Sequence, residues 1–193
     1  MKYEWVLASA SPRRKELLKM VIDDYTIVVS DCEEKYTSEK PGDIVKELAQ
    51  LKGRAVAGKV GDNTIVISAD TVVCVDGKIL GKPCNYDEAV NMLSSLSGRK
   101  HQVYTGVCVI CKSEEKTEES VFSEVTDIFV DELSLKEIHD YVISEEPYDK
   151  AGSYAIQGSF AKHISRICGD YNNVVGFPVY AFYKMIKEKG YIK

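Results

Sequence analysis

Residues 64–80, TIVISADTVVCVDGKIL, carry the pattern that decides the fold of this chain. The apolar run at 64–68 is typical of a central strand with both faces covered, and we expect it to end at Ala69-Asp70-Thr71. The runs VVCV and KIL flank Asp76-Gly77, a dipeptide that favours the tight turn of a β-hairpin. The stretch therefore predicts the middle of a sheet, with polar groups where its central strand ends.

Two strands and two helices are predicted on the N-terminal side of this stretch. The strand at 4–8 is followed by Ser11, a favourable helix N-cap, and the helix then runs to about residue 20. A β-branched strand at 25–29 comes next. A second helix begins at residue 41, and its apolar face is formed by Ile44, Leu48, Leu51 and Ala55, with Lys52 beside it.

The C-terminal side repeats this mixture of helices and strands. Helices are expected after Asn85-x-x-Glu88, after Ser134-x-x-Glu137 and near Pro178, and strands at 103–111 and 121–130. Helix-linked strands together with hairpins indicate an α/β fold, a mixed twisted sheet flanked by helices. We expect residues 1–193 to form a single domain, as two lobes that share one sheet around a cleft.

Composition excludes several classes of protein. The formal net charge of −5 leaves no general positive field for nucleic acid. No apolar run is long enough to cross a membrane, and the N-terminus lacks the apolar core of a signal peptide, so we expect a cytoplasmic protein. Cys108 and Cys111 form a C-x-x-C, but strand alternation would point their thiols to opposite faces, against a metal or redox pair.

The first candidate site is the strand-to-helix junction from Ser9 to Arg14. Hydroxyls, two guanidinium groups and the N–H groups of a first helical turn converge there, which suits an anion. The alternative is an ordinary N-cap beside two solvated arginines.

The second candidate is Asp70, which could bind a hard divalent cation or take a proton from water. Lys82 follows the hairpin and could turn back toward Asp70, and Glu33 or Glu34 could supply a second carboxylate for a metal. The alternatives are a turn aspartate, a surface lysine and a solvated acidic loop. His101 and His139 are expected at the surface, and the motifs of P-loop NTPases, dinucleotide dehydrogenases and α/β-hydrolases are missing.

Six segments in order then give a resemblance: LASASPRRKELL, SADTVV, ILGKP, LSGRKHQVYTGV, EPYDKAGSYAIQG and GDYNNVVGFPV. From about residue 5 to 188 the chain resembles the Maf family of nucleotide pyrophosphatases. The resemblance implies a fold similar to the inosine-triphosphatase type and hydrolysis of a nucleoside triphosphate to the monophosphate and pyrophosphate. The segments at 68–71 and 151–158 resemble the branch acting on dTTP and UTP, with modified pyrimidine nucleotides as further candidates.

The resemblance also assigns roles to single residues. Asp70 resembles the family's catalytic proton acceptor, and Lys52 and Lys82 match polar positions expected to assist it. Asp70 and Glu33 are the implied ligands of Mg²⁺ or Mn²⁺. The positions matching substrate-binding or specificity residues are Ser9, Arg13, Arg14, Thr71 and Gln157. A homodimer is implied as well.

Two alternatives remain at this stage. One is a nucleotide-sensing regulatory protein linked to cell division, with little turnover. The other is a nucleic-acid binder that uses the basic patch at 99–101, which the acidic balance disfavours. Gly53, where the family usually has alanine, is expected to loosen its helix and to shift Lys52 slightly.

Overall fold

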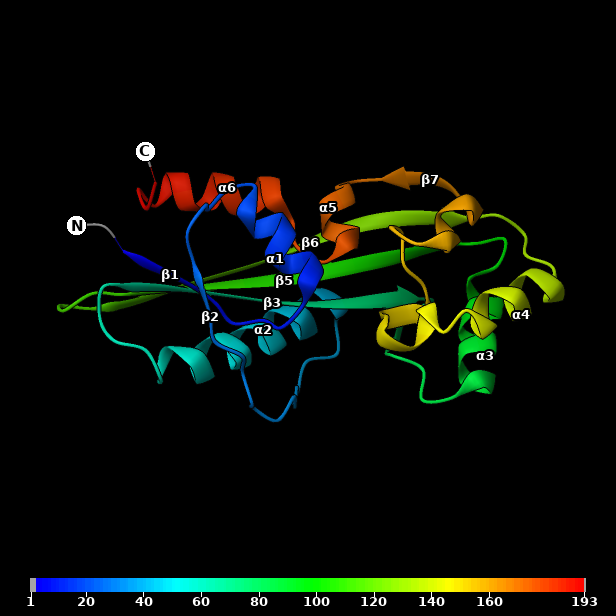
Figure 1. Cartoon of the computed structure of the whole chain (residues 1–193), viewed down its shortest axis with the longest axis horizontal. Coiled ribbons are helices and arrows are strands. Elements are labelled where there is room, and N and C mark those ends of the chain that lie inside the picture. Colours follow the sequence, from blue (N-terminus) through cyan, green and yellow to red (C-terminus); the bar gives the residue numbers. More distant parts are fainter. Residues whose placement is uncertain (1–2, 193) are drawn as a thin grey trace.

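A seven-stranded mixed sheet runs through the molecule (Figure 1). The structure, a computed structural model, describes residues 3–192. The strands are β1 (Glu4–Leu7), β2 (Thr26–Ile27), β3 (Thr64–Val75), β4 (Lys78–Leu80), β5 (Lys100–Lys112), β6 (Thr117–Val130) and β7 (Ile164–Cys168). Their order is β2-β1-β3-β5-β6-β7, with β4 also paired to β3. β1 is parallel to β2 and β3 and the other pairs are antiparallel, so the predicted mixed sheet is confirmed.

Helices cover both faces of this sheet. They are α1 (Pro12–Lys19), α2 (Pro41–Ala57), α3 (Tyr86–Leu96), α4 (Leu135–Ile143), α5 (Tyr171–Val175) and α6 (Val179–Glu188), with short 3₁₀ turns at Glu146–Asp149, Ala151–Ser153 and Ser159–His163. Figure 1 shows α2 on one face and α1 and α6 on the other, while α3 and α4 pack at one end of the long strands. Across residues 3–192, none of the helices combines the length and the apolar character that a membrane crossing requires.

The two faces of the sheet bury separate apolar cores. The larger core includes Leu7, Leu18 and Phe182, and the smaller one lies between the sheet and α2. Cys108 belongs to the smaller core and Cys111 to the larger. The prediction that these thiols point to opposite faces is therefore confirmed.

The prediction that the central strand ends at Ala69-Asp70-Thr71 is wrong. β3 continues to Val75 because β5 pairs with it from Thr64 to Cys74, so Asp70 lies in mid-strand opposite Gly106. On the other edge of β3, pairing with β1 ends at Ile67, and pairing with β4 starts only at Val73. In the part of the chain that the structure describes, β3 has no strand beside residues 68–72 on that edge.

Local helix signals are largely confirmed. The Ser11 hydroxyl accepts a hydrogen bond from the Arg14 N–H at 3.4 Å, and Ser134 forms a reciprocal capping box with Glu137. Asn85 accepts from the N–H of Glu88, but the Glu88 carboxylate accepts from the N–H of Cys84 instead, so that box is half formed.

Other expectations need correction. The strand predicted at 25–29 is reduced to Thr26–Ile27, because only two residues pair with β1 at the sheet edge. β7 and α5 were not predicted, since neither has a long periodic pattern. His101 is fully buried rather than at the surface, where its Nε2 meets the Tyr154 hydroxyl at 2.7 Å.

Candidate active site

A cleft of about 870 Å³ is lined in part by the stretch of β3 that lacks a neighbour strand. Residues 70–73 of β3 form part of its lining. The start of α1, the middle of α2 and the turn after β4 contribute to it as well, together with segments 146–158 and 174–176 and with Glu34, Tyr36 and Val103. The position of the site is therefore set by the gap along β3 between its pairing with β1 and its pairing with β4. This gap is a property of the whole sheet.

Asp70 and Lys52 form the most enclosed charged pair in this cleft. The Lys52 ammonium lies 2.5 Å from Oδ1 of Asp70, and their side chains are only 15% and 12% exposed. Glu34, on the loop before α2, holds the same ammonium at 3.0 Å. One lysine thus connects two carboxylates that are far apart in sequence.

Two glycines let α2 approach the sheet closely enough for this contact. A Cβ at Gly106, opposite Asp70, would lie 2.2 Å from the carbonyl oxygen of Val45. A Cβ at Gly53 would lie 2.7 Å from Oγ of Ser68. α2 runs unbroken through Gly53.

Arg14 is fixed on the other side of β3. Its Nε donates to the carbonyl of Gly176 at 3.0 Å, and one terminal nitrogen donates to the hydroxyl of Thr71 at 3.1 Å. Burial lowers the pKa of the Arg14 guanidinium, and Asp70 opposes that shift. The guanidinium stays protonated at any physiological pH, because arginine starts from a very high pKa.

Most of the other predicted site residues reach the same cleft. Arg13, Lys82 and Gln157 line it, although Lys82 is exposed and makes no ion pair with Asp70 among the described residues. Ser9 is buried behind Arg14, with its hydroxyl 3.5 Å from the guanidinium.

Glu33 does not reach the site. It is exposed and paired with Lys35 at 2.9 Å, and it does not line the cleft, whereas the neighbouring Glu34 does. A loop without regular structure gives no pattern that tells which of two consecutive glutamates turns inward.

Further cleft residues carried no signal of their own in the sequence. Lys150 lines the cleft with a side chain 14% exposed and is paired with Asp149. Tyr36 also lines it, from the same loop as Glu34. Lys150 lies within the segment EPYDKAGSYAIQG, which pointed to this region without singling it out.

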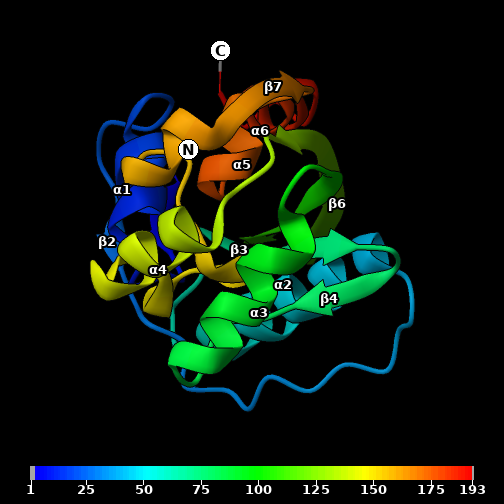
Figure 2. The ribbon, with the colours of Figure 1, turned by 90° about the vertical axis from the view of Figure 1, so that its right-hand side faces the viewer.

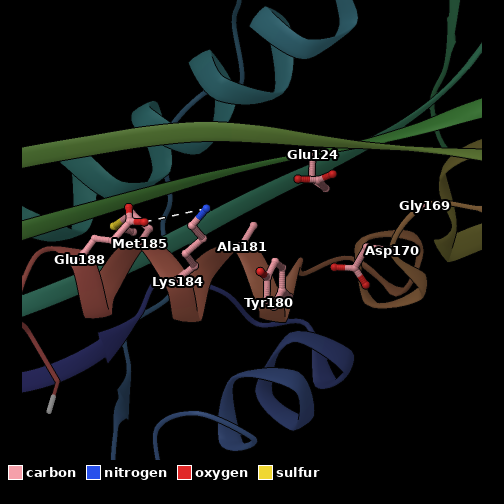
Figure 3. A pocket seen from close by; sticks show the side chains of 8 residues that line it. All are labelled: Glu124, Gly169, Asp170, Tyr180, Ala181, Lys184, Met185 and Glu188. Carbon is pink, nitrogen blue, oxygen red and sulfur yellow. Dashed lines mark ion pairs between the residues drawn. The ribbon is translucent and has the colours of Figure 1, made fainter.

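A second hollow of about 610 Å³ lies between α6, β6 and the start of α5 (Figure 3). Its charged side chains are Glu124, Asp170, Glu188 and Lys184, and the last two lie 3.9 Å apart. Three carboxylates against one lysine disfavour a phosphate, so this hollow does not compete with the first cleft for an anionic ligand.

The chemistry of the first cleft is that of an anion site with a carboxylate at its centre. It is lined by five cationic side chains, namely Arg13, Arg14, Lys52, Lys82 and Lys150. Five carboxylates line it as well, those of Glu16, Glu34, Asp70, Glu146 and Asp149. Lys52 and Lys150 are paired with some of them, whereas Arg13, Arg14 and Lys82 form no ion pair among the described residues and can bind phosphate oxygens. Asp70 is placed to act on a bond within such a ligand.

Comparisons with known proteins agree with this picture. The family model described as Maf-like protein matches residues 4–189. A Lachnoclostridium phytofermentans protein named dTTP/UTP pyrophosphatase is 47% identical over 189 residues, which span 97% of this chain and 96% of that protein. A Bacillus cereus protein of the same name is 47% identical over 184 residues, or 95% of this chain and 94% of its own length.

Solved structures are similar in fold at much lower sequence identity. The Ham1 protein of Staphylococcus aureus superposes with a TM-score of 0.53 at 16% identity, covering 96% of this chain and 99% of that one. The HAM1 protein of Coxiella burnetii gives a TM-score of 0.51 at 15% identity over the same shares of the two chains. The predicted α/β fold class is confirmed by these neighbours.

Proposed function

The chain belongs to the Maf family, and on that premise we propose that it is a nucleoside triphosphate pyrophosphatase, a hydrolase of acid anhydrides that converts dTTP and UTP to the monophosphate and pyrophosphate. The observation that carries the proposal is the buried contact between Asp70 and Lys52 inside a cleft that also holds the guanidinium groups of Arg13 and Arg14. Removal of unwanted nucleotides from the cellular pool is the role that fits such an activity.

The cationic side chains neutralise the negative charge of the substrate. A nucleoside triphosphate carries about four negative charges, and these must be neutralised before a nucleophile can approach phosphorus. Arg13 and Arg14 offer planar guanidinium groups that can hold two oxygens at once, and Lys82 and Lys150 also line the cleft. As the bond to the leaving pyrophosphate breaks, the same groups stabilise the charge that moves onto it.

Asp70 supplies the proton acceptor. In the proposed step a water oxygen bonds to the α-phosphorus, the bond from that phosphorus to the bridging oxygen breaks, and the water proton passes to Asp70. Lys52 holds the carboxylate in place through Oδ1, which leaves the second oxygen for the water. A positioned base of this kind contributes about 10²–10⁴-fold in rate.

We further propose that the enzyme uses Mg²⁺ or Mn²⁺. Within residues 3–192 no group of three or more histidine, cysteine or acidic side chains is arranged to hold a metal ion. The residues nevertheless fit, because Mg²⁺ is commonly bound by one or two carboxylates together with substrate phosphates and water. Asp70 and Glu34 both contact Lys52, and these two carboxylates would be the protein ligands of the metal ion. Glu33 is the alternative ligand that the sequence suggested. When bound, the metal would neutralise phosphate oxygens.

Base recognition is assigned to Arg13, Thr71 and Gln157. All three line the cleft. The amide of Gln157 can donate and accept at once, as the edge of a pyrimidine requires.

We also propose a cytoplasmic location, where the nucleotide pool is, and the six free cysteines are in keeping with a reducing compartment.

The proposed function is tested by measuring pyrophosphate release from dTTP, UTP, CTP and 7-methylguanosine triphosphate, offered separately and in competition. We expect turnover of dTTP and UTP, and a loss of about 10²–10⁴-fold in Asp70→Asn. Asp76→Asn is the matched control, because Asp76 lies in the β3–β4 turn with a positive φ of 50° that asparagine tolerates.

Two results would contradict the proposal. Near-normal turnover by Asp70→Asn would remove Asp70 from the chemistry. Tight nucleotide binding with negligible turnover by the unmodified protein would instead favour a nucleotide-sensing regulatory protein.

A further inference from the structure

A line of hydrogen bonds leaves the cleft at Thr71 and enters the protein interior. The guanidinium of Arg14 lies 3.1 Å from Oγ1 of Thr71, which lies 2.9 Å from Oγ1 of Thr105. The Thr105 hydroxyl in turn lies 2.9 Å from the carbonyl oxygen of Asn173. Thr105 and Asn173 are fully buried, so water cannot replace these partners.

The two ends of this line fix the direction of every hydrogen bond in it. Arginine can only donate and a carbonyl oxygen can only accept. Thr105 must therefore donate its single proton to Asn173, which leaves Thr105 as an acceptor toward Thr71. Thr71 then donates its own proton to Thr105 and accepts from Arg14.

Asn173 holds the inner end of the line rigidly. Its Nδ2 donates to the carbonyl of Val103 and to Oγ1 of Thr126, each at 3.0 Å. The Thr126 hydroxyl donates onward to the carbonyl of Asp170 at 2.9 Å. These contacts connect α5 to both β5 and β6, so the Asn173 carbonyl is not free to turn away from Thr105.

The Thr71 hydroxyl can only accept a hydrogen bond on the side that faces the cleft. A hydroxyl has one proton and two lone pairs. The proton is given to Thr105 and one lone pair receives Arg14, so the cleft meets only the remaining lone pair. Thr71 is half-buried and lines the cleft. An ionised phosphate has no proton to offer, so the group that Thr71 binds is not a phosphate.

We propose that Thr105 and Asn173 are positioning residues that make the Thr71 hydroxyl an obligate acceptor for a hydrogen-bond donor on the nucleoside part of the substrate. In dTTP and UTP such donors are the N3–H of the base and the 3′-hydroxyl of the sugar. This inference rests on the proposed function, which supplies the nucleotide. It adds a specificity-determining role for two residues that do not themselves line the cleft.

Binding of monophosphates tests the inference without any turnover. Isothermal titration calorimetry compares UMP with N3-methyl-UMP, which lacks the N3–H, and with 3′-deoxy-UMP, which lacks the 3′-hydroxyl. In the unmodified protein we expect one of these analogues to bind about tenfold more weakly than UMP, the value of one hydrogen bond. The analogue that loses affinity identifies which donor meets Thr71.

Substitutions then assign the effect to the line of hydrogen bonds. In Thr71→Val we expect UMP and the affected analogue to bind equally. In Thr105→Val we expect the difference to shrink, because the Thr71 hydroxyl is then free to turn its proton toward the cleft. Thr105→Ser keeps the hydroxyl and restores the difference. Thr64→Val, a buried threonine farther along β3, is the matched control and leaves the difference intact.

Two results would overturn the inference: equal binding of all three monophosphates by the unmodified protein, or a tenfold difference that persists in Thr71→Val or is undiminished in Thr105→Val. If Thr105→Val does not fold, Thr105→Cys takes its place, because a thiol is a weak donor and acceptor. A protein that shows the expected binding pattern but releases no pyrophosphate would refute the proposed function and leave this inference standing.

Discussion

Replacing Gly106 by alanine tests whether the close packing of α2 against the sheet sets the geometry of the site. A Cβ at this position would lie 2.2 Å from the carbonyl oxygen and 2.3 Å from the carbonyl carbon of Val45. Ordinary contacts between such atoms are about 3.5 Å, so α2 must retreat by about 1 Å. The obstacle is backbone, which cannot be relieved by a change of rotamer.

The retreat of α2 has two expected consequences. Overpacking of this kind costs about 1–3 kcal/mol, which lowers the Tm of a chain of this size by about 2–12 °C. Because α2 carries Lys52, the 2.5 Å contact with Asp70 should also break. A misplacement of about 1 Å in catalytic groups can reduce the rate by about 10²-fold.

The assay combines pyrophosphate release from UTP with thermal unfolding followed by circular dichroism. Gly61→Ala is the control, since a Cβ at Gly61 meets nothing within 4 Å. On an Asp70→Asn background, Gly106→Ala should add little to the loss of rate, because both changes act on one pair. Normal kcat in Gly106→Ala, with or without a lower Tm, would refute the claim that this packing positions the site.

Three further predictions follow from other parts of the structure. Glu34→Gln should raise the Mg²⁺ concentration needed for half-maximal activity by about tenfold, whereas Glu33→Gln should not, since only Glu34 reaches Lys52 in the cleft. Burial lowers the pKa of His101 to about 4, so the unfolded state binds the proton first, and the free energy of unfolding should fall by about 3 kcal/mol between pH 6.5 and pH 4. Gly53→Ala should cost about 1–3 kcal/mol, with Ser68→Ala in the same chain recovering part of it, because the new Cβ would lie 2.7 Å from Oγ of Ser68.

Each of these has a result that would contradict it. Equal Mg²⁺ dependence in the two glutamine variants would show that Glu34 has no special access to the metal. A His101→Gln protein that loses the same stability between pH 6.5 and pH 4 would assign the loss to other groups. Purely additive effects in urea denaturation of the Gly53 and Ser68 variants would show that the two side chains do not compete for space.

Features that depend on neighbours along the chain follow from the amino-acid sequence alone. Ser11 and Ser134 begin their helices as predicted, because an N-cap is a contact over three residues. The hairpin around Asp76-Gly77 forms because a two-residue turn needs only local positive φ values. The ordered segments contain Asp70, Arg13, Arg14 and Lys82, and the family resemblance added Lys52; all of these line the cleft.

The tertiary structure decided everything that depends on which segment lies opposite. The polar residues Asp70 and Thr71 predicted the end of a strand. β3 nevertheless continues through them to Val75, because it pairs with β5. Glu34 rather than Glu33 turns inward because Lys52 lies across from it on another element. His101 is buried because Tyr154, 53 residues away, covers it. Such contacts join residues whose separation in sequence carries no periodic signal, so only the packed sheet selects them.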